Sequence, residues 1–206
     1  MSTLREYRWI VMILLWTSLV MASGITPVFC AQDTVIEASP RLHPKREQYQ
    51  TELAGYVTQL ETINLDPKRY PTYNDYYQDI VAQVQEIIQD IEQIEFLEVL
   101  FYECNILRGR NTDQMKVQWL DPYHQCAERI LSRLQEIGTE ESVMTLVNLL
   151  ADETLEYDGA YATSMCSCIV ASGEMAIPYL RHVKNARKPF AQRIIELIEK
   201  GWNSCI

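Results

Sequence analysis

The sequence has few of the residues on which many enzyme sites depend. It contains seven glycines and three histidines among 206 residues. The glycines form no phosphate-binding loop of the glycine-rich kind. The histidines, His43, His124 and His182, are scattered, whereas a zinc site needs three or four converging ligands. We therefore expect a protein that is not an enzyme and that holds neither a cofactor nor a metal ion.

Basic residues are also scarce. The chain has 18 Lys and Arg against 28 Asp and Glu, a formal net charge of −10. Binding to nucleic acid or to an anionic membrane surface depends on clustered basic side chains, which release counterions. This balance excludes both as expected partners. The acidity itself favours solubility.

The first 24 residues have the three parts of a secretory signal peptide. Arg5 and Arg8 precede an uncharged apolar run over residues 9–22, and small residues follow it. A cut after Ala22 or after Gly24 fits the preference for small residues at this site. Removing residues 1–24 leaves 16 Lys and Arg against 27 Asp and Glu, a formal charge of −11. We expect a periplasmic or secreted protein.

Two alternatives to a cleaved signal stay open. One is an uncleaved N-terminal anchor, although the apolar run is shorter than the roughly 20 residues that span a membrane. The other is a lipoprotein lipidated at Cys30, where Phe29 occupies the position expected to hold a small residue. No second apolar segment of the sequence is long enough to span a membrane, so we expect no integral span after cleavage.

Periodicity divides the rest of the chain into three parts. Residues 25–44 contain three prolines and no sustained period, which indicates an extended leader. Residues 45–121 predict a helical hairpin: a first helix that ends before Asp66-Pro67, and one very long helix that reaches about residue 108. The long helix has a narrow apolar seam with heptad spacing. After Ile94 the apolar residues shift to other positions, so that the buried face rotates. The seam consists of Tyr77, Ile80, Val84, Ile87, Ile91 and Ile94.

Residues 122–206 repeat themselves. Asp121-Pro122 predicts a helix start, because Asp accepts hydrogen bonds from free N–H groups and Pro fits the first turn. Three segments then share an i, i+3, i+4, i+7 apolar face that is ended by glycine, and the first two are displaced by 35 residues. A shorter second helix follows each of the first two glycines. Helix pairs at such a period indicate a solenoid. The segments are 127–138, 162–173 and 191–201.

The stretch Gly173-Glu-Met-Ala-Ile-Pro-Tyr-Leu180 resembles the junction of short bacterial HEAT repeats, with a Gly, an apolar pair, a Pro and a Leu. Residues 137–146 are similar, with Met144 in place of the proline. The resemblance covers residues 122–201. It implies an all-α fold in which the N-terminal hairpin leads into a short HEAT-like α-solenoid. The chain departs from the family at 152–160, where the usual stacking arginine is missing.

Six cysteines are present, and an even number in an oxidising compartment suggests disulfides. Six cysteines allow fifteen connectivities. We predict Cys104–Cys126 across the loop between consecutive helices, and Cys168–Cys205 at neighbouring helix ends. If the signal is cut beyond Cys30, five cysteines remain.

The expected function is protein binding or scaffolding outside the cytoplasm, because helical solenoids present extended binding surfaces. The resemblance places the surface on Glu141, Thr145, Tyr179 and His182. A second candidate surface consists of Tyr73, Tyr76 and Tyr77, because tyrosine is enriched at protein interfaces.

Two further hypotheses stay open. One is a thiol or metal-binding protein that uses Cys166 and Cys168. Residues i and i+2 of a helix point about 200° apart, however, so both thiols reach one ion only if the helix unwinds. The other is a structural protein that self-associates through the seam over residues 80–94.

Overall fold

The computed structural model describes residues 42–63, 66–108, 120–155 and 159–202, and every regular element in these ranges is helical. The predicted all-α class is therefore confirmed for this part of the chain. The predicted signal peptide, most of the leader, Cys30 and Cys205 lie outside it. The elements are η1 Arg46–Tyr49, α2 Gln50–Thr62, η2 Pro67–Arg69, α3 Tyr73–Ile88, α4 Ile94–Leu107, α5 Pro122–Ile137, α6 Glu140–Ala151, α7 Gly159–Ala171, η4 Gly173–Ala176, α8 Ile177–Leu180 and α9 Lys188–Glu199.

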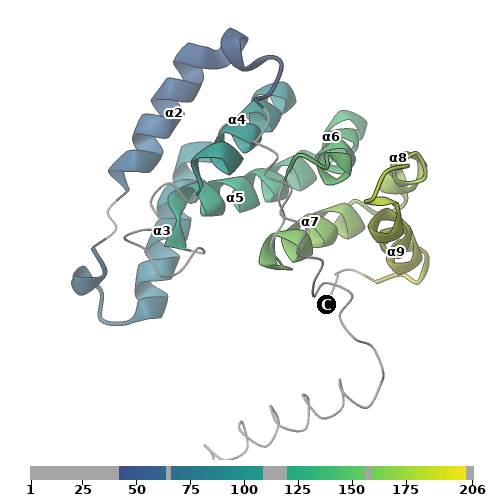
Figure 1. Cartoon of the computed structure of the whole chain (residues 1–206). Coiled ribbons are helices and arrows are strands. Elements are labelled where there is room, and N and C mark those ends of the chain that lie inside the picture. The colour runs from purple at the N-terminus through teal and green to yellow at the C-terminus, as the bar shows by residue number, and fades with distance from the viewer. Residues whose placement is uncertain (1–41, 64–65, 109–119, 156–158, 203–206) are drawn as a thin grey trace, which may run out of the picture. The chain divides into compact units, whose positions relative to one another are not determined.

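Helix α5 packs against most of the other α-helices. It contacts α3, α4, α6 and α7, and to a smaller extent α2, and Figure 1 shows it among these helices. Its side chains Ile130, Leu131 and Leu134 are fully buried. Burying one such side chain contributes about 1.5–3 kcal/mol, so α5 organises much of the apolar core.

The prediction of one very long helix is wrong. The chain forms two helices instead, because α3 ends at Ile88 and α4 begins at Ile94. The connection turns sharply after residue 88, and Gln93 is extended. It is anchored where Arg133 of α5 donates from Nε to the carbonyl of Ile91 at 3.1 Å. The break falls near the slip in the apolar seam, and it lets both helices turn their apolar faces toward α5.

The apolar seam is used inside the chain. Ile80 and Val84 are fully buried, and Ile91 is nearly so. The buried stripe of α3 runs through Tyr76, Ile80, Val84 and Ile88, at steps of four. The central residues of the seam are therefore covered within one chain, and self-association through the seam stays a prediction.

The predicted helix ends in the C-terminal half are confirmed. Asp121 accepts a hydrogen bond from the N–H of Tyr123 at 3.0 Å, and Pro122 occupies the first turn of α5. Gly138, Gly173 and Gly201 have φ angles of 63°, 62° and 70°. This left-handed conformation is one that glycine adopts without steric cost.

Polar contacts join the loop after α6 to the loop before α9. The N–H of Ala186 donates to Glu153 at 2.7 Å, and Arg187 donates from Nη2 to the carbonyl of Leu155 at 2.9 Å. Asn185 also donates to the carbonyl of Ala151. Arg187 stands 35 residues after Asp152, so an arginine reaches back from the second loop to the first.

Candidate functional site

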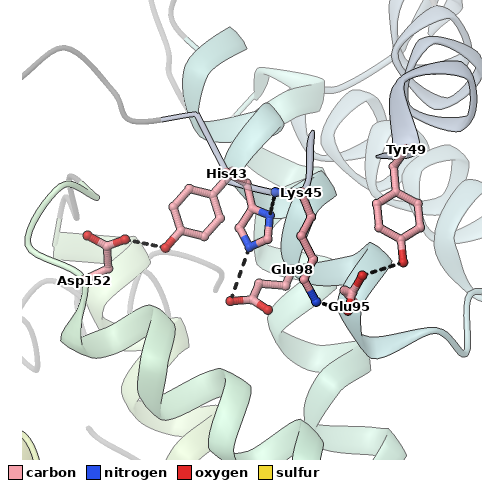
Figure 2. A network of polar contacts seen from close by, with 7 residues as sticks. His43, Lys45, Tyr49, Glu95, Glu98 and Asp152 are labelled. Carbon is pink, nitrogen blue, oxygen red and sulfur yellow. Dashed lines mark hydrogen bonds and ion pairs between the residues drawn. The ribbon is translucent and has the colours of Figure 1, made fainter. Parts of the chain in front are cut away.

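A polar network lies where the chain enters the helical fold. Residues 43–49 pack against α4. Figure 2 shows the side chains of His43, Lys45 and Tyr49 facing acidic residues of that helix, Glu95 and Glu98. The N-terminal clasp, as we call this site, is formed by His43, Lys45, Arg46 and Tyr49 together with Glu95, Glu98 and Glu103.

Two carboxylates of the clasp are held by strong hydrogen bonds. Arg46 donates from Nε and Nη2 to the two carboxylate oxygens of Glu103, at 2.6 and 2.9 Å. This bond raises the pKa of Arg46. Lys45 and Tyr49 both donate to Glu95, and these bonds, with Lys45 the larger influence, lower the pKa of Glu95. Such charge-assisted bonds fix the segment in register on α4.

His43 and Glu98 lie close together in a more buried part of the clasp. His43 Nε2 lies 3.7 Å from a carboxylate oxygen of Glu98. Burial lowers the pKa of His43, with Lys45 adding to the effect, and burial raises the pKa of Glu98. Both shifts favour the neutral form, because desolvation penalises charge.

The clasp also reaches the end of α6. The ring of Tyr102 lies against His43, with 5.1 Å between the ring centroids, and its hydroxyl donates to Asp152. Asp152 also accepts from the N–H and hydroxyl of Thr154, at 2.8 and 2.7 Å. The network therefore connects the N-terminal segment, α4 and the loop after α6. Its groups hold one another in place, which is an arrangement suited to anchoring a segment.

A second polar cluster surrounds the fully buried Tyr161. Ser164 donates to a carboxylate oxygen of Glu128 at 2.8 Å, and His124 Nε2 lies 3.8 Å from the same oxygen. In a Ser–His–acid triad the imidazole stands between the hydroxyl and the carboxylate. Here the carboxylate contacts the hydroxyl directly, so this arrangement does not activate Ser164 through His124.

The structure describes Cys104, Cys126 and Cys168 as free thiols. Cys104 and Cys126 are fully buried and their side chains share a hydrogen bond, so they are neighbours that are not bonded covalently. A disulfide between them stays a prediction.

The structure also describes Cys168 as a free thiol, so its predicted disulfide with Cys205 stays a prediction as well. The side chain of Cys168 forms a hydrogen bond with Ser132 of α5, and burial raises the pKa of the Cys168 thiol to about 11. Cys205 lies outside the described residues. Cys166 is the disulfide-bonded cysteine of α7, which removes one thiol from the proposed Cys166–Cys168 metal pair. Among the described residues, no group of three or more His, Cys, Asp or Glu is arranged to hold a metal ion.

The predicted tyrosine surface is only partly exposed. Tyr73 is 45% exposed, Tyr77 is half-buried, and Tyr76 is 3% exposed. The placement of Tyr76 on the surface is therefore wrong. Its ring lies tilted against that of Tyr70 and edge-on to that of Tyr73, with centroids 5.1 and 6.5 Å away, and it begins the buried stripe of α3.

The surface predicted on the repeats is more nearly correct. Glu141 and His182 are exposed, and Tyr179 is half-buried. Thr145 is buried, so its placement on this surface is wrong. The exposed side of α6 passes through Glu140, Glu141 and Met144, and Thr145 falls just outside it among the residues that face the core.

Two exposed methionines belong to the same surface and were missed. Met144 on α6 and Met175 on η4 are 39% and 44% exposed, and these two elements contact each other. Tyr179 donates from its hydroxyl to Glu140, which joins α8 to α6. The 35-residue displacement was the signal that sequence reasoning left unused, because it matches Glu140 with Met175 and Met144 with Tyr179. Glu140, Glu141, Met144, Met175 and Tyr179 form what we call the second-helix ridge.

Two hollows lie elsewhere on the surface. One, of about 330 Å³, lies between α8 and α9 and is lined by residues that include Leu180, Val183 and Ile195. The other, of about 460 Å³, lies between α2 and α3 and is lined mostly by polar side chains. Ile195 is half-buried, whereas Leu131 and Cys166, its counterparts in the two preceding segments, are buried.

Comparison with models of protein families, with curated proteins and with solved structures gave no match. Within residues 42–202, as far as they are described, no helix is both long and apolar enough to cross a membrane.

Proposed function

We propose that the protein is an exported, non-enzymatic protein-binding or scaffolding protein that binds its partner through the second-helix ridge. The observation that carries the proposal is the exposure of Met144 and Met175 on neighbouring elements. Methionine is flexible and polarisable, and it is favoured on surfaces that adapt to another protein. Tyr179 adds a half-buried aromatic side chain, a residue type enriched at interfaces.

We further propose that the C-terminal half is a short HEAT-like solenoid. Helix α5 is followed by α6, and α7 by η4 and α8, each pair with a glycine of positive φ at its junction. Helix α9 follows as the start of a third pair. The bonds from Ala186 to Glu153 and from Arg187 to Leu155 join successive loops, which is the role that the stacking arginine plays in the family it resembles. In such a stack, equivalent side chains of successive pairs line up on one surface.

The charges of the ridge define the chemistry of the partner. Glu140 and Glu141 lie exposed on α6, and Glu174 lies exposed beside Met175. Acidic side chains around an apolar strip suit a partner segment that offers apolar side chains together with Lys or Arg. An amphipathic helix with a basic side fits this description, and we expect its binding to weaken as salt is raised.

The compartment of the proposed function follows from the predicted signal peptide over residues 1–24. The protein would meet its partner in the periplasm or outside the cell. The N-terminal clasp would have a supporting role there, since it anchors the end of the leader to α4.

Affinity capture from the native envelope or medium tests the proposal when it is combined with variants of the ridge. The double variant Met144→Glu and Met175→Glu should lose the captured partner, because it adds charge to the apolar strip. Tyr73→Glu is the matched control, since Tyr73 is equally exposed but lies on α3. Equal capture by both variants would refute the ridge as the binding surface, and circular dichroism would confirm that both remain folded.

A further inference from the structure

Cys104 and Cys126 form a pair of thiols inside the apolar core. Cys104 lies in the last turn of α4 and Cys126 in the second turn of α5. Their exposed fractions are 1% and 0%, and one side chain is hydrogen-bonded to the other. The two cysteines therefore lie side by side on helices that pack on each other, which is the arrangement that a disulfide bond of about 2.05 Å requires.

The surroundings of the pair make the folded thiols unreactive. The hydrogen bond to Cys126, burial, and the nearby negative charges of Asp121 and Glu103 all raise the pKa of Cys104. Thiol–disulfide exchange requires a thiolate and access to it. The folded core provides little of either, so the redox state of this pair is protected once the core has closed.

We propose that Cys104 and Cys126 are a site of disulfide modification that is oxidised while the chain folds, and that the closed core then preserves whichever redox state was present. The oxidant is a disulfide compound, either a small one such as oxidised glutathione or a protein disulfide. This inference depends on folding in an oxidising compartment, and it does not depend on the binding surface.

The oxidation balances as two successive exchanges. The thiolate of one cysteine attacks the oxidant, which forms a mixed disulfide and releases one thiolate. The second cysteine thiolate then attacks the sulfur of the first, which forms the Cys104–Cys126 bond and releases the other half of the oxidant. The two thiol protons pass to the released thiolates, so the pair loses two electrons and the oxidant gains them.

The bond would close a loop of 23 residues, from the end of α4 to the start of α5. In the chain-entropy description, a loop of this size disfavours the unfolded state by a factor of about 100 or more. The oxidised protein should therefore unfold at a clearly higher urea concentration than the reduced protein. The connection between two helices that pack closely on each other would then be fixed covalently.

The order of events is tested with the full chain and a glutathione redox buffer. One sample is denatured, reduced and refolded in the buffer, and the other is folded in reduced form before the buffer is added. After free thiols are blocked, tryptic digestion separates the pair, because peptides 70–108 and 117–129 each contain a single cysteine. Mass spectrometry then counts the linked peptides.

We expect the linked peptides in the refolded sample and at least 10-fold less of them in the sample that was folded first. Absence of the link after refolding would overturn the site, as would pairing of either cysteine with another one. Equal oxidation of both samples would overturn the protection by the closed core. A Cys168→Ala variant should behave as the unmodified chain does. The test uses the unmodified chain, so it does not require that a Cys104→Ala or Cys126→Ala variant folds.

Discussion

Arg46 and Glu103 are 57 residues apart in the chain and meet in a two-pronged hydrogen bond, at 2.6 and 2.9 Å. The carboxylate is the more buried partner, since its side chain is 9% exposed and that of Arg46 is 35% exposed. A buried carboxylate whose cationic partner is removed keeps the free-energy cost of desolvation without the compensating attraction, which destabilises the fold. The pair is therefore the strongest anchor of the N-terminal clasp.

Replacing Arg46 by Ala should lower the free energy of unfolding by about 1–2 kcal/mol, a value reduced by the solvent that reaches the guanidinium. Urea denaturation measures the change. Arg69→Ala is the control, because Arg69 is 67% exposed in its ion pair with Asp66 and should change stability by less than about 0.5 kcal/mol. Equal losses for the two variants would contradict the role of Arg46 as an anchor.

The clasp should make stability depend on pH through His43. Its pKa is lower in the folded protein than its ordinary value of 6.5, so the unfolded chain binds the proton more readily. The contribution of His43 is therefore present above pH 6.5 and is lost as the pH falls toward the folded pKa. Urea unfolding at pH 7.5 and 5.5 should show a smaller loss for His43→Gln than for the unmodified chain. His182→Gln, at an exposed position, is the control.

Glu98 contributes with the opposite sign. Burial raises its pKa above 4.5, so its contribution is present below pH 4.5 and is lost as the pH rises through the folded pKa. Lys45, Glu95 and Tyr102 surround the same pair and remain in place in either variant. If Glu98→Gln and His43→Gln change the pH dependence in the same direction, burial is not the cause of the two shifts.

Two glycines should respond in opposite ways to replacement by Ala. Gly138 ends α5 at a φ of 63°, where a β-carbon costs about 1–2 kcal/mol. Gly55 lies within α2, and a β-carbon there meets no atom within 4 Å. Gly55→Ala should therefore stabilise the protein by about 0.5–1 kcal/mol. Thermal or urea unfolding of the two single variants checks both signs, and a loss for Gly55→Ala would contradict the placement of this residue in an open helix face.

Replacement by Ala should destabilise the protein by different amounts at equivalent positions of α5 and α9. Leu131 on α5 is fully buried, so Leu131→Ala should cost about 2–5 kcal/mol. Ile195 on α9 is half-buried beside the hollow between α8 and α9, so Ile195→Ala should cost about 1 kcal/mol. Similar losses would mean that α9 is covered as fully as α5.

Local chemistry made the helix ends predictable. The start at Asp121-Pro122 and the end at Gly138 depend on atoms within a few residues, so the sequence contains the whole interaction. The break between Ile88 and Ile94 has neither proline nor glycine to indicate it. It depends on α5, whose Arg133 holds the carbonyl of Ile91, and such a partner is not visible from local periodicity.

The candidate sites were predictable to a smaller extent. Periodicity assigns a residue to a helix face, but the neighbouring helices decide which faces are covered, and this is why Tyr76 and Thr145 were misplaced. The clasp was missed because its partners are about 50 residues apart. The basic segment from His43 to Arg46 and the acidic residues of α4 were each present in the sequence, but nothing local paired them.

The clasp also determines how the fold bears mechanical load. A pull on the chain at Leu42 reaches His43, Lys45 and Arg46 before it reaches any residue of α2. These side chains pass the force sideways into α4, which packs along α5. Tension from the leader is therefore carried by the apolar core, and α2 is shielded from being peeled away one turn at a time.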